Sequence, residues 1–204
     1  MASVLDTTNA LISLDTLKGY LSADTYDEFL DDTTTDNELE RIINAASRWA
    51  NRYTGVDLIS REHTEYYDGD GSRTLYLDNF PVTSSVSEIA LYIDTDREYE
   101  DDDKVESGDI ILYSDVGKII VEDTVFSRGA QSVKITYTAG YVLADVPDDL
   151  AYAVKLICAA MWKKKKDKLV NVTSVSIEGN SVSIAEKDIP ALAAEILDEF
   201  SRLK

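Results

Sequence analysis

The clearest alternation of hydrophobic and polar positions lies in SVKITYTAG, residues 132–140. Val133, Ile135 and Tyr137 alternate there with polar residues, which is the period-two pattern of a strand with one buried face. Gly140 follows, and a glycine frees the backbone for angles that other residues avoid. The pattern therefore predicts a strand that ends abruptly at this glycine.

A long helix is predicted directly after a short polar link. Pro147 stands where a first helical residue is often found, and Asp148 and Asp149 place negative charge at the positive end of the helix dipole. Apolar residues then recur at helical spacing and predict one buried stripe. These residues are Leu150, Val154, Ile157, Cys158 and Met161.

Two helices are predicted in the first 62 residues. Ser13 is placed to cap a short one, and Thr35 with Glu38 has the capping-box spacing at the start of a longer one that Gly55 would end. The short helix has its apolar face at Leu14, Leu17 and Leu21. The longer helix has its apolar positions at Leu39, Ile42, Ile43, Ala46, Trp49, Ala50 and Tyr53.

Short alternating runs broken by Gly, Asp and Asn occupy residues 64–138 and predict a β-rich block. Within it, residues 94–109 are too charged to pack, so an exposed acidic loop is expected there. After the long helix, two alternating runs around Gly179 and Asn180 predict a hairpin. A last helix follows Pro190, with apolar positions at Leu192, Ile196, Leu197 and Phe200.

Together these elements predict an α+β fold, in which a bundle of about three to four helices carries a β-rich insertion. The predicted parts are a helical part over residues 1–62, the insertion over 63–140, the main helix over 141–169, and a C-terminal hairpin and helix over 170–204.

Composition changes this picture mainly through charge. The 204 residues include 39 acidic and 20 basic side chains, and the formal net charge is -19. Such a surface repels nucleic acid by default and favours solubility and basic partners. With 44% hydrophobic residues the chain can bury a core, and no run has the apolar length of a membrane span. We therefore expect a soluble protein made in the cytoplasm.

The DGDGS segment invites a calcium interpretation, since Asp68, Asp70 and Ser72 occupy the first three alternate ligand positions of an EF-hand loop. The sixth position is Arg73 instead of Gly, and the twelfth is Asn79 instead of Glu. A hairpin turn rich in Asp and Gly explains the segment more simply. The three residues stay weak metal candidates.

Catalytic chemistry finds little support in the sequence. His63 is the only histidine, and Cys158, the only cysteine, lies on an apolar stripe, where a buried small hydrophobe is the simpler interpretation. No Gly-x-Ser-x-Gly elbow, Walker motif or dinucleotide-binding glycine motif occurs. We therefore expect no enzyme and no cofactor. Asp101, Asp102 and Asp103 could be considered as paired carboxylates, but adjacent exposed carboxylates are better explained as a solvated loop or an electrostatic partner surface. Asp94 and Asp96 belong to the same acidic loop.

One basic run stands out in this acidic chain. Lys163, Lys164, Lys165 and Lys166 end the long helix, where cations complement the helix dipole. The functional alternative is a docking point for an acidic partner surface or for phosphates, with Trp162 as an anchor.

Several segments together resemble the head-tail connector family of tailed bacteriophages, also called adaptor or head-completion proteins. They are LISLDTLKGYL, EYYDGDGSRTLYLDNFPVTSSVSEIALY, GKIIVED and VKITYTAGYVLADVPDDLAYAVKLICAAMWKKKKD. The most specific parts are residues 80–83 (FPVT) and 137–141 (YTAGY), and the resemblance covers about residues 11–168. It explains the abrupt strand end, because in that family a β insertion returns the chain to the main helix of a compact bundle.

The resemblance implies a structural virion protein of the neck, assembled in the host cytoplasm, that forms a ring, commonly twelvefold in that family, under the portal protein. It would join the DNA-filled head to the tail, form part of the DNA channel, and contact a stopper or tail-terminator protein. Portal contact would fall on residues 170–204, so the interface candidates are Leu192, Ile196 and Phe200 with the basic run. A ring needs a head-to-tail interface, expected near Trp49 and the insertion.

Three alternatives stay open at this stage. Another neck protein, such as a stopper or tail-completion protein, would share the location. A calcium- or carbohydrate-binding β module would draw on Asp68 and Asp70 with the aromatic residues Tyr66, Tyr67 and Tyr76. An acidic hydrolase would need two distant carboxylates that no spacing indicates.

Overall fold

The structure is a computed structural model, and it describes residues 3–22, 33–166, 174–177, 180–183 and 189–201. The chain forms two compact units. One unit comprises Met1–Gly55 and Asp145–Lys204, and the other comprises Val56–Ala144. We call them the helical unit and the β unit. The mixed α+β fold predicted from the sequence is confirmed.

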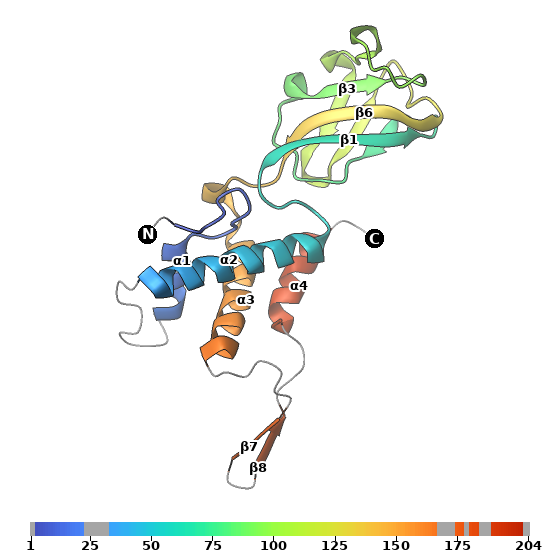
Figure 1. Ribbon diagram of the computed structural model, residues 1–204. Helices are drawn as coiled ribbons and strands as arrows, with labels where there is room; N and C mark the ends of the chain where they lie inside the picture. Colours follow the sequence, from blue (N-terminus) through green and yellow to red (C-terminus); the bar gives the residue numbers. More distant parts are fainter. Residues whose placement is uncertain (1–2, 23–32, 167–173, 178–179, 184–188, 202–204) are drawn as a thin grey trace. The chain divides into compact units, whose positions relative to one another are not determined.

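The helical unit contains four helices among the residues that the structure describes (Figure 1). They are α1 (Leu14–Ser22), α2 (Thr33–Thr54), α3 (Asp148–Lys166) and α4 (Ala191–Glu199). Helices α2, α3 and α4 pack on one another, and α1 packs on α2 and α3. The fully buried side chains at their centre include Leu17, Leu39, Ile43, Leu150, Val154, Ile157, Cys158 and Leu197. Helical spacing therefore identified the core, although Met161 is only half-buried.

The predicted helix ends are correct in two cases and wrong in one. Ser13 caps α1, since its Oγ accepts a hydrogen bond from the Thr16 amide at 3.1 Å. Gly55 ends α2 with a φ of 72°. Thr35, however, lies inside α2, which begins at Thr33. Three consecutive threonines are nearly equivalent as local caps, so the capping pattern does not distinguish which of them starts the helix.

Polar side chains of α2 hold the segment before α1. The Glu40 carboxylate accepts a hydrogen bond from the Val4 amide at 2.6 Å, and Asn44 Oδ1 accepts one from the Asp6 amide at 2.9 Å. Ser47 Oγ accepts one from the Leu11 amide at 3.1 Å. The three α2 residues are buried, and their spacing places them on one face of the helix. This stripe of polar residues was not recognised in the sequence.

The β unit contains two three-stranded antiparallel sheets. The strands are β1 (Arg61–Gly69), β2 (Thr74–Tyr76), β3 (Ala90–Ile93), β4 (Ile110–Tyr113), β5 (Lys118–Val121) and β6 (Gly129–Ala139). Their order is β1-β6-β3 in one sheet and β2-β5-β4 in the other. Short 3-10 helices lie at Val86–Glu88, Asp101–Asp103, Ser107–Asp109, Ser114–Val116 and Leu143–Asp145.

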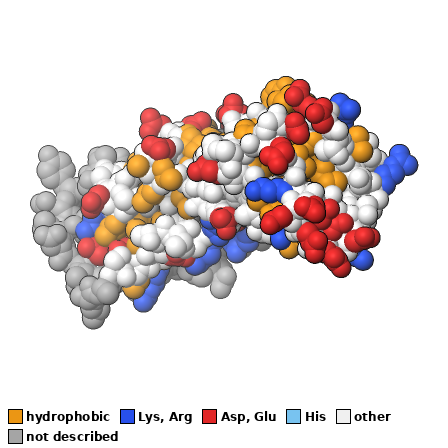
Figure 2. Space-filling model, turned by 90° about the horizontal axis from the view of Figure 1, so that it is seen from above, with side chains coloured by type: hydrophobic (Ala, Val, Ile, Leu, Met, Phe, Trp, Pro, Cys, Tyr) orange, Lys and Arg blue, Asp and Glu red, His pale blue; other side chains and the backbone are white. Residues whose placement is uncertain are grey.

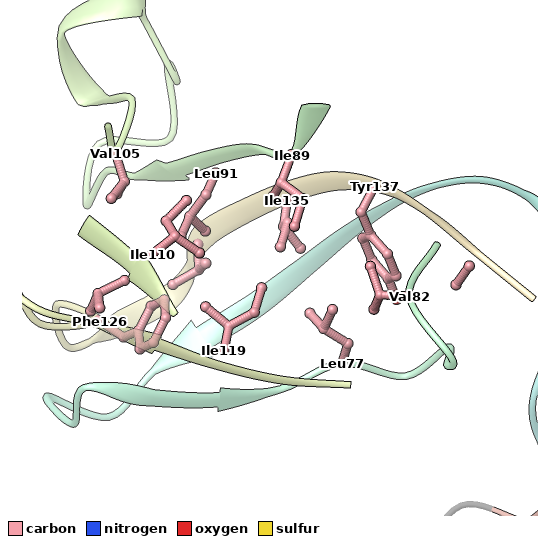
Figure 3. Close-up of a cluster of buried hydrophobic side chains, with 13 residues drawn as sticks. Leu77, Val82, Ile89, Leu91, Val105, Ile110, Ile119, Phe126, Ile135 and Tyr137 are labelled. Carbon is pink, nitrogen blue, oxygen red and sulfur yellow. The ribbon is translucent and has the colours of Figure 1, made fainter. Parts of the chain in front are cut away.

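Inward-facing side chains of both sheets form one core (Figure 3). Leu91, Ile135 and Tyr137 come from the first sheet, and Ile119 from the second faces them. The alternation that predicted the β6 strand thus corresponds to a real buried face. Phe126, from the segment before β6, closes one end of this core.

The predicted hairpin at DGDGS is wrong. The segment is a turn, but β1 pairs with β6 and β2 pairs with β5, so the turn joins two different sheets. The Asp and Gly residues of the segment suit a turn within a hairpin and a turn between two sheets equally well. Pairing was decided by length and burial, because β1 matches the long β6 strand whereas β2 spans only Thr74–Tyr76.

The C-terminal hairpin predicted from alternation is present in the backbone. Strand β7 (Ser174–Ile177) pairs antiparallel with β8 (Asn180–Ser183), and Ser174 is opposite Ser183. Gly179, expected in the turn, lies outside the described residues. A search of the described helices finds none with the length and apolar character of a membrane span.

Candidate interface surfaces

The predicted basic run forms the last turn of α3, which we call the basic tip and define as Trp162 and Lys163–Lys166. Lys163, Lys165 and Lys166 are exposed, whereas Lys164 and Trp162 are half-buried. Lys165 Nζ lies 2.5 Å from a carboxylate oxygen of Glu38 on α2 and 5.8 Å from the centre of the Trp162 ring. The lysine side chain lowers the pKa of Glu38, chiefly through this hydrogen bond and its charge. The tip is therefore anchored to α2, and Lys163 and Lys166 are exposed residues at its end.

A second surface lies between the C-terminal half of α2 and α4, and we call it the aromatic groove. The Trp49 and Tyr53 rings stack with their centres 4.8 Å apart. The Tyr53 hydroxyl donates a hydrogen bond to Asp198 Oδ1 at 2.9 Å, which joins the two helices and raises the pKa of Tyr53. The groove has a volume of about 550 Å³. Its lining residues are Trp49, Tyr53, Ile189, Ala191, Ala194, Glu195 and Asp198.

The predicted apolar interface residues of α4 lie on a different side of that helix. At about 100° per residue, Leu192, Ile196 and Phe200 fall within one sector of about 80°. Leu192 is exposed, with 48% of its surface accessible, and the other two are half-buried. Ala193 and Leu197, which are buried, lie between this sector and the groove-lining residues. Helix α4 therefore presents an apolar side and a groove side on opposite flanks of its buried face.

The acidic segment 94–109 is exposed at its carboxylates, but it is not merely a solvated loop. Asp94 accepts hydrogen bonds from the backbone amides of Asp96, Glu98 and Tyr99 at 2.7, 2.6 and 3.0 Å. These bonds, led by that of Tyr99, lower the pKa of Asp94. Val105 is buried in the core of the β unit, against the expectation that the segment is too charged to pack. Val105 and the Asp94 hydrogen bonds both tie the segment to the β unit, and a count of charges misses them.

The other predicted acidic positions have ordinary surface roles. Asp101 and Asp102 are exposed, and Asp96 is exposed beside the Asp94 turn. The Asp103 carboxylate accepts a hydrogen bond from the Glu100 amide at 3.1 Å. No contact among the described residues gathers these four carboxylates at one point. They therefore form an acidic surface.

The weak metal candidates contribute to a turn. Asp68 Oδ1 accepts a hydrogen bond from the Gln131 amide, and Asp70 Oδ1 accepts one from the Ser72 amide, each at 2.7 Å. The bonds from Ser72 lower the pKa of Asp70. Among the described residues, no group of three His, Cys, Asp or Glu side chains is arranged to hold a metal ion. Turn formation explains these side chains, and a metal there stays a prediction without support from the geometry.

A carboxylate network that sequence reasoning missed lies inside the β unit. Glu65 accepts hydrogen bonds from the hydroxyls of Tyr67 and Tyr137 and from Asn79 Nδ2, the last two at 2.7 Å. Burial, and then the bond to Glu65, raises the pKa of both tyrosines. The sequence does indicate part of this network, because Glu65 and Tyr67 are two residues apart and therefore lie on the same, inward side of a strand. All donors are satisfied within the fold, so the network is structural.

The two candidates for nucleophilic chemistry differ in burial, since His63 is half-buried whereas Cys158 is fully buried. His63 lies on the same side of β1 with its ring centre 5.7 Å from that of Tyr137, and burial lowers its pKa. Cys158 is fully buried on α3, and burial raises the pKa of its thiol to about 12. A protonated buried thiol is a poor nucleophile.

Comparison with solved structures identifies the fold. A chain in the neck of an empty gene transfer agent (GTA) particle computed with C6 symmetry has a TM-score of 0.63 and 17% identity, covering 100% of this chain and 94% of that one. A chain of the native GTA virion gives 0.62 and 17%, with the same coverage. A chain in the native neck computed with C12 symmetry gives 0.54 and 18%, covering 95% of this chain and 92% of that one. At such identities the likeness establishes the fold.

Sequence comparison identifies the family. No curated protein matches the chain. The family model described as "Head completion protein" matches residues 11–203, which is nearly the whole sequence and extends beyond the segments that suggested the resemblance. Because the match spans both units and the C-terminal part, this chain belongs to the head completion protein family.

Proposed function

We propose that the protein is a structural, non-enzymatic component of the neck of a tailed phage or phage-like particle. It forms a ring under the portal protein and joins the DNA-filled head to the tail, where a stopper or tail-terminator protein contacts its other end. One observation carries this proposal: the family match over residues 11–203, in a chain whose fold is shared along its full length with proteins of GTA necks.

The proposed ring has twelve copies. Support comes from the related fold in a GTA neck computed with C12 symmetry, and a second neck was computed with C6 symmetry. A ring of identical chains requires a heterologous interface, in which two different patches on each copy meet and the rotation between copies closes. The two separate surfaces of the helical unit, the basic tip and the aromatic groove, meet the first requirement.

The ring surrounds part of the DNA channel without gripping the DNA. A lining rich in Lys and Arg would bind phosphates through counterion release, whereas a chain with a net charge of -19 repels them. Among the charged side chains on the face of the molecule shown in Figure 2, more are acidic than basic. The same charge makes the copies repel one another, so specific contacts must close the ring.

Portal contact is assigned to the C-terminal part, residues 170–204. Among its described residues, Leu192 and Ile196 form the apolar side of α4, and Phe200 follows directly as the C-cap residue of that helix. An exposed leucine flanked by half-buried apolar residues is suited to contact a partner, because the contact removes apolar surface from water.

The test is to determine particle mass by light scattering, with electron-microscopic imaging, for the protein alone and mixed with its cognate portal. A closed ring, alone or on the portal, is the expected result. The Leu192→Asp variant should bind the portal at least tenfold more weakly, since it places a charge in the apolar contact. The matched control is Leu143→Asp at an exposed site of the β unit. A wild-type chain that neither forms a ring nor binds the portal contradicts the proposal.

A further inference from the structure

We infer that the basic tip of one copy docks in the aromatic groove of a second copy, and that this contact closes the ring. The inference rests on the proposed function and names the two surfaces involved. It commits the tip to an acidic partner surface on the same protein rather than on the portal.

The chemistry of the groove suits lysine side chains. Glu195 and Asp198 supply carboxylates, and Trp49 and Tyr53 supply stacked aromatic rings. Carboxylates form charge-assisted hydrogen bonds with ammonium groups, and aromatic faces attract cations through their quadrupole. The groove is an open depression of about 550 Å³, so side chains of a second copy can reach its carboxylates from outside.

The chemistry of the tip is complementary. Lys163 and Lys166 are exposed at the end of α3, and Trp162 offers an apolar surface beside them. The tip is the one run of consecutive lysines in a chain of net charge -19. The lysines of the tip are positive, and the carboxylates of the aromatic groove on the next copy are negative. Attraction between these groups therefore opposes the repulsion between the negatively charged copies where they meet.

A single chain does not bring its own tip and groove together. Lys165 is held at Glu38, near the start of α2, whereas Trp49 and Tyr53 lie toward the end of that helix. At about 1.5 Å per residue, these two residues are roughly 16 and 22 Å further along the helix axis from Glu38. Each copy therefore carries one tip and one groove at opposite ends of α2, which is the arrangement that a head-to-tail ring requires.

Helix α4 carries residues of both proposed contacts. Its groove side carries Ala194, Glu195 and Asp198, and its apolar side carries Leu192 and Ile196 on the other flank of the buried face. Leu192 and Glu195 are only about 60° apart on the exposed side of the helix, so the two contacts adjoin there.

A charge exchange tests the contact in the full-length chain. The tip variant is Lys163→Glu with Lys166→Glu, and the groove variant is Glu195→Lys with Asp198→Lys. We expect each variant alone to associate at least tenfold more weakly than the wild type in sedimentation equilibrium at fixed ionic strength. An equimolar mixture should regain association in a ring where the two variants alternate. In that ring each reversed tip meets a reversed groove, and each unchanged tip meets an unchanged groove.

The control for net charge is Arg73→Glu with Arg97→Glu, two exposed residues of the β unit. It changes the net charge as much as the tip variant but should affect association far less. Equal loss in the control and the tip variant would overturn the inference, as would failure of the mixture to regain association while circular dichroism shows both variants folded.

A cysteine pair provides a second test that does not depend on charge. Lys163→Cys combined with Ala194→Cys should yield a ladder of disulfide-linked oligomers on oxidation, whereas Lys163→Cys combined with Ser87→Cys on the β unit should not.

If the wild type forms rings only on the portal, the charge exchange and the cross-linking are both carried out on that ring. Rings without tip-to-groove cross-links refute the inference but leave the proposed function intact. A tip variant that loses portal binding and keeps its rings would assign the tip to the portal. Absence of any ring refutes the proposed function itself.

Discussion

At Gly140 the backbone leaves no room for a side chain. Its φ is 98°, and a Cβ atom there would lie 2.6 Å from the carbonyl carbon of Ile59 and 2.8 Å from the amide nitrogen of Ser60. The Gly140 amide donates a hydrogen bond to the Pro81 carbonyl at 2.9 Å, so the position is also held from the other side. This glycine lets β6 end where two segments of the β unit converge.

We predict that Gly140→Ala lowers the free energy of unfolding by more than about 1 kcal/mol, because alanine disfavours a positive φ and its methyl group meets backbone atoms. Gly108→Ala is the matched control, since nothing lies within 4 Å of a Cβ built there. Urea denaturation followed by circular dichroism measures both. Equal stability of the two variants would contradict the assigned role of Gly140.

The Glu65 network gives a second prediction at this scale. Tyr137 is only 1% exposed, and its hydroxyl donates to Glu65 at 2.7 Å. Tyr137→Phe leaves a partly buried carboxylate with one donor fewer, which should cost about 1–3 kcal/mol in urea denaturation. Tyr113→Phe, at an exposed tyrosine, should change stability by less than about 0.5 kcal/mol. A neutral Tyr137→Phe would show that the bond adds nothing.

At the scale of elements, one carboxylate organises the turn after β3. Asp94 receives three backbone amides, and the residues around it include Arg97 and Tyr99 with φ values of 67° and 54°. Positive φ is unfavourable for such residues, so the Asp94 bonds and the buried Val105 together hold the acidic segment in place. The segment is therefore an ordered part of the β unit.

We predict that Asp94→Ala increases amide exchange at Glu98 and Tyr99, whereas Asp102→Ala, with the same change in charge, does not. The pKa of Asp94 is lowered below its ordinary value of 3.8, because backbone hydrogen bonds favour the charged form. Protection of these amides should therefore persist at mildly acidic pH and be lost only as the pH falls through the lowered pKa. Hydrogen exchange followed by NMR measures this. Loss of protection well above 3.8 would contradict it.

At the scale of the whole molecule, net charge dominates the behaviour toward DNA. With 39 acidic and 20 basic side chains, the free chain should show no measurable affinity for duplex DNA near 0.15 M salt. Fluorescence anisotropy of a labelled duplex checks this. Binding that disappears in the tip variant would show that Lys163–Lys166 hold phosphates, and the proposed role of the tip in ring closure would then have to be abandoned.

Local patterns were sufficient to predict most elements. Alternation identified β6, helical spacing identified the buried residues of α3, and Ser13 and Gly55 were correctly assigned as caps. Each of these depends on the residues within a turn or two of the position concerned, so the sequence alone determines it. The α+β fold class and the place of the β block between helices followed from the same patterns. The family was suggested by the sequence as well.

Tertiary structure alone decided features that depend on residues far apart in the chain. Strand pairing is one: a turn between β1 and β2 is compatible with a hairpin, but the longer ladder with β6 buries more apolar surface. The aromatic groove is another, since Trp49 and Asp198 meet only when α2 packs on α4. The sequence determined which residues are apolar, charged or able to cap, whereas packing determined which of them share a surface, because burial selects partners by shape and not by distance along the chain.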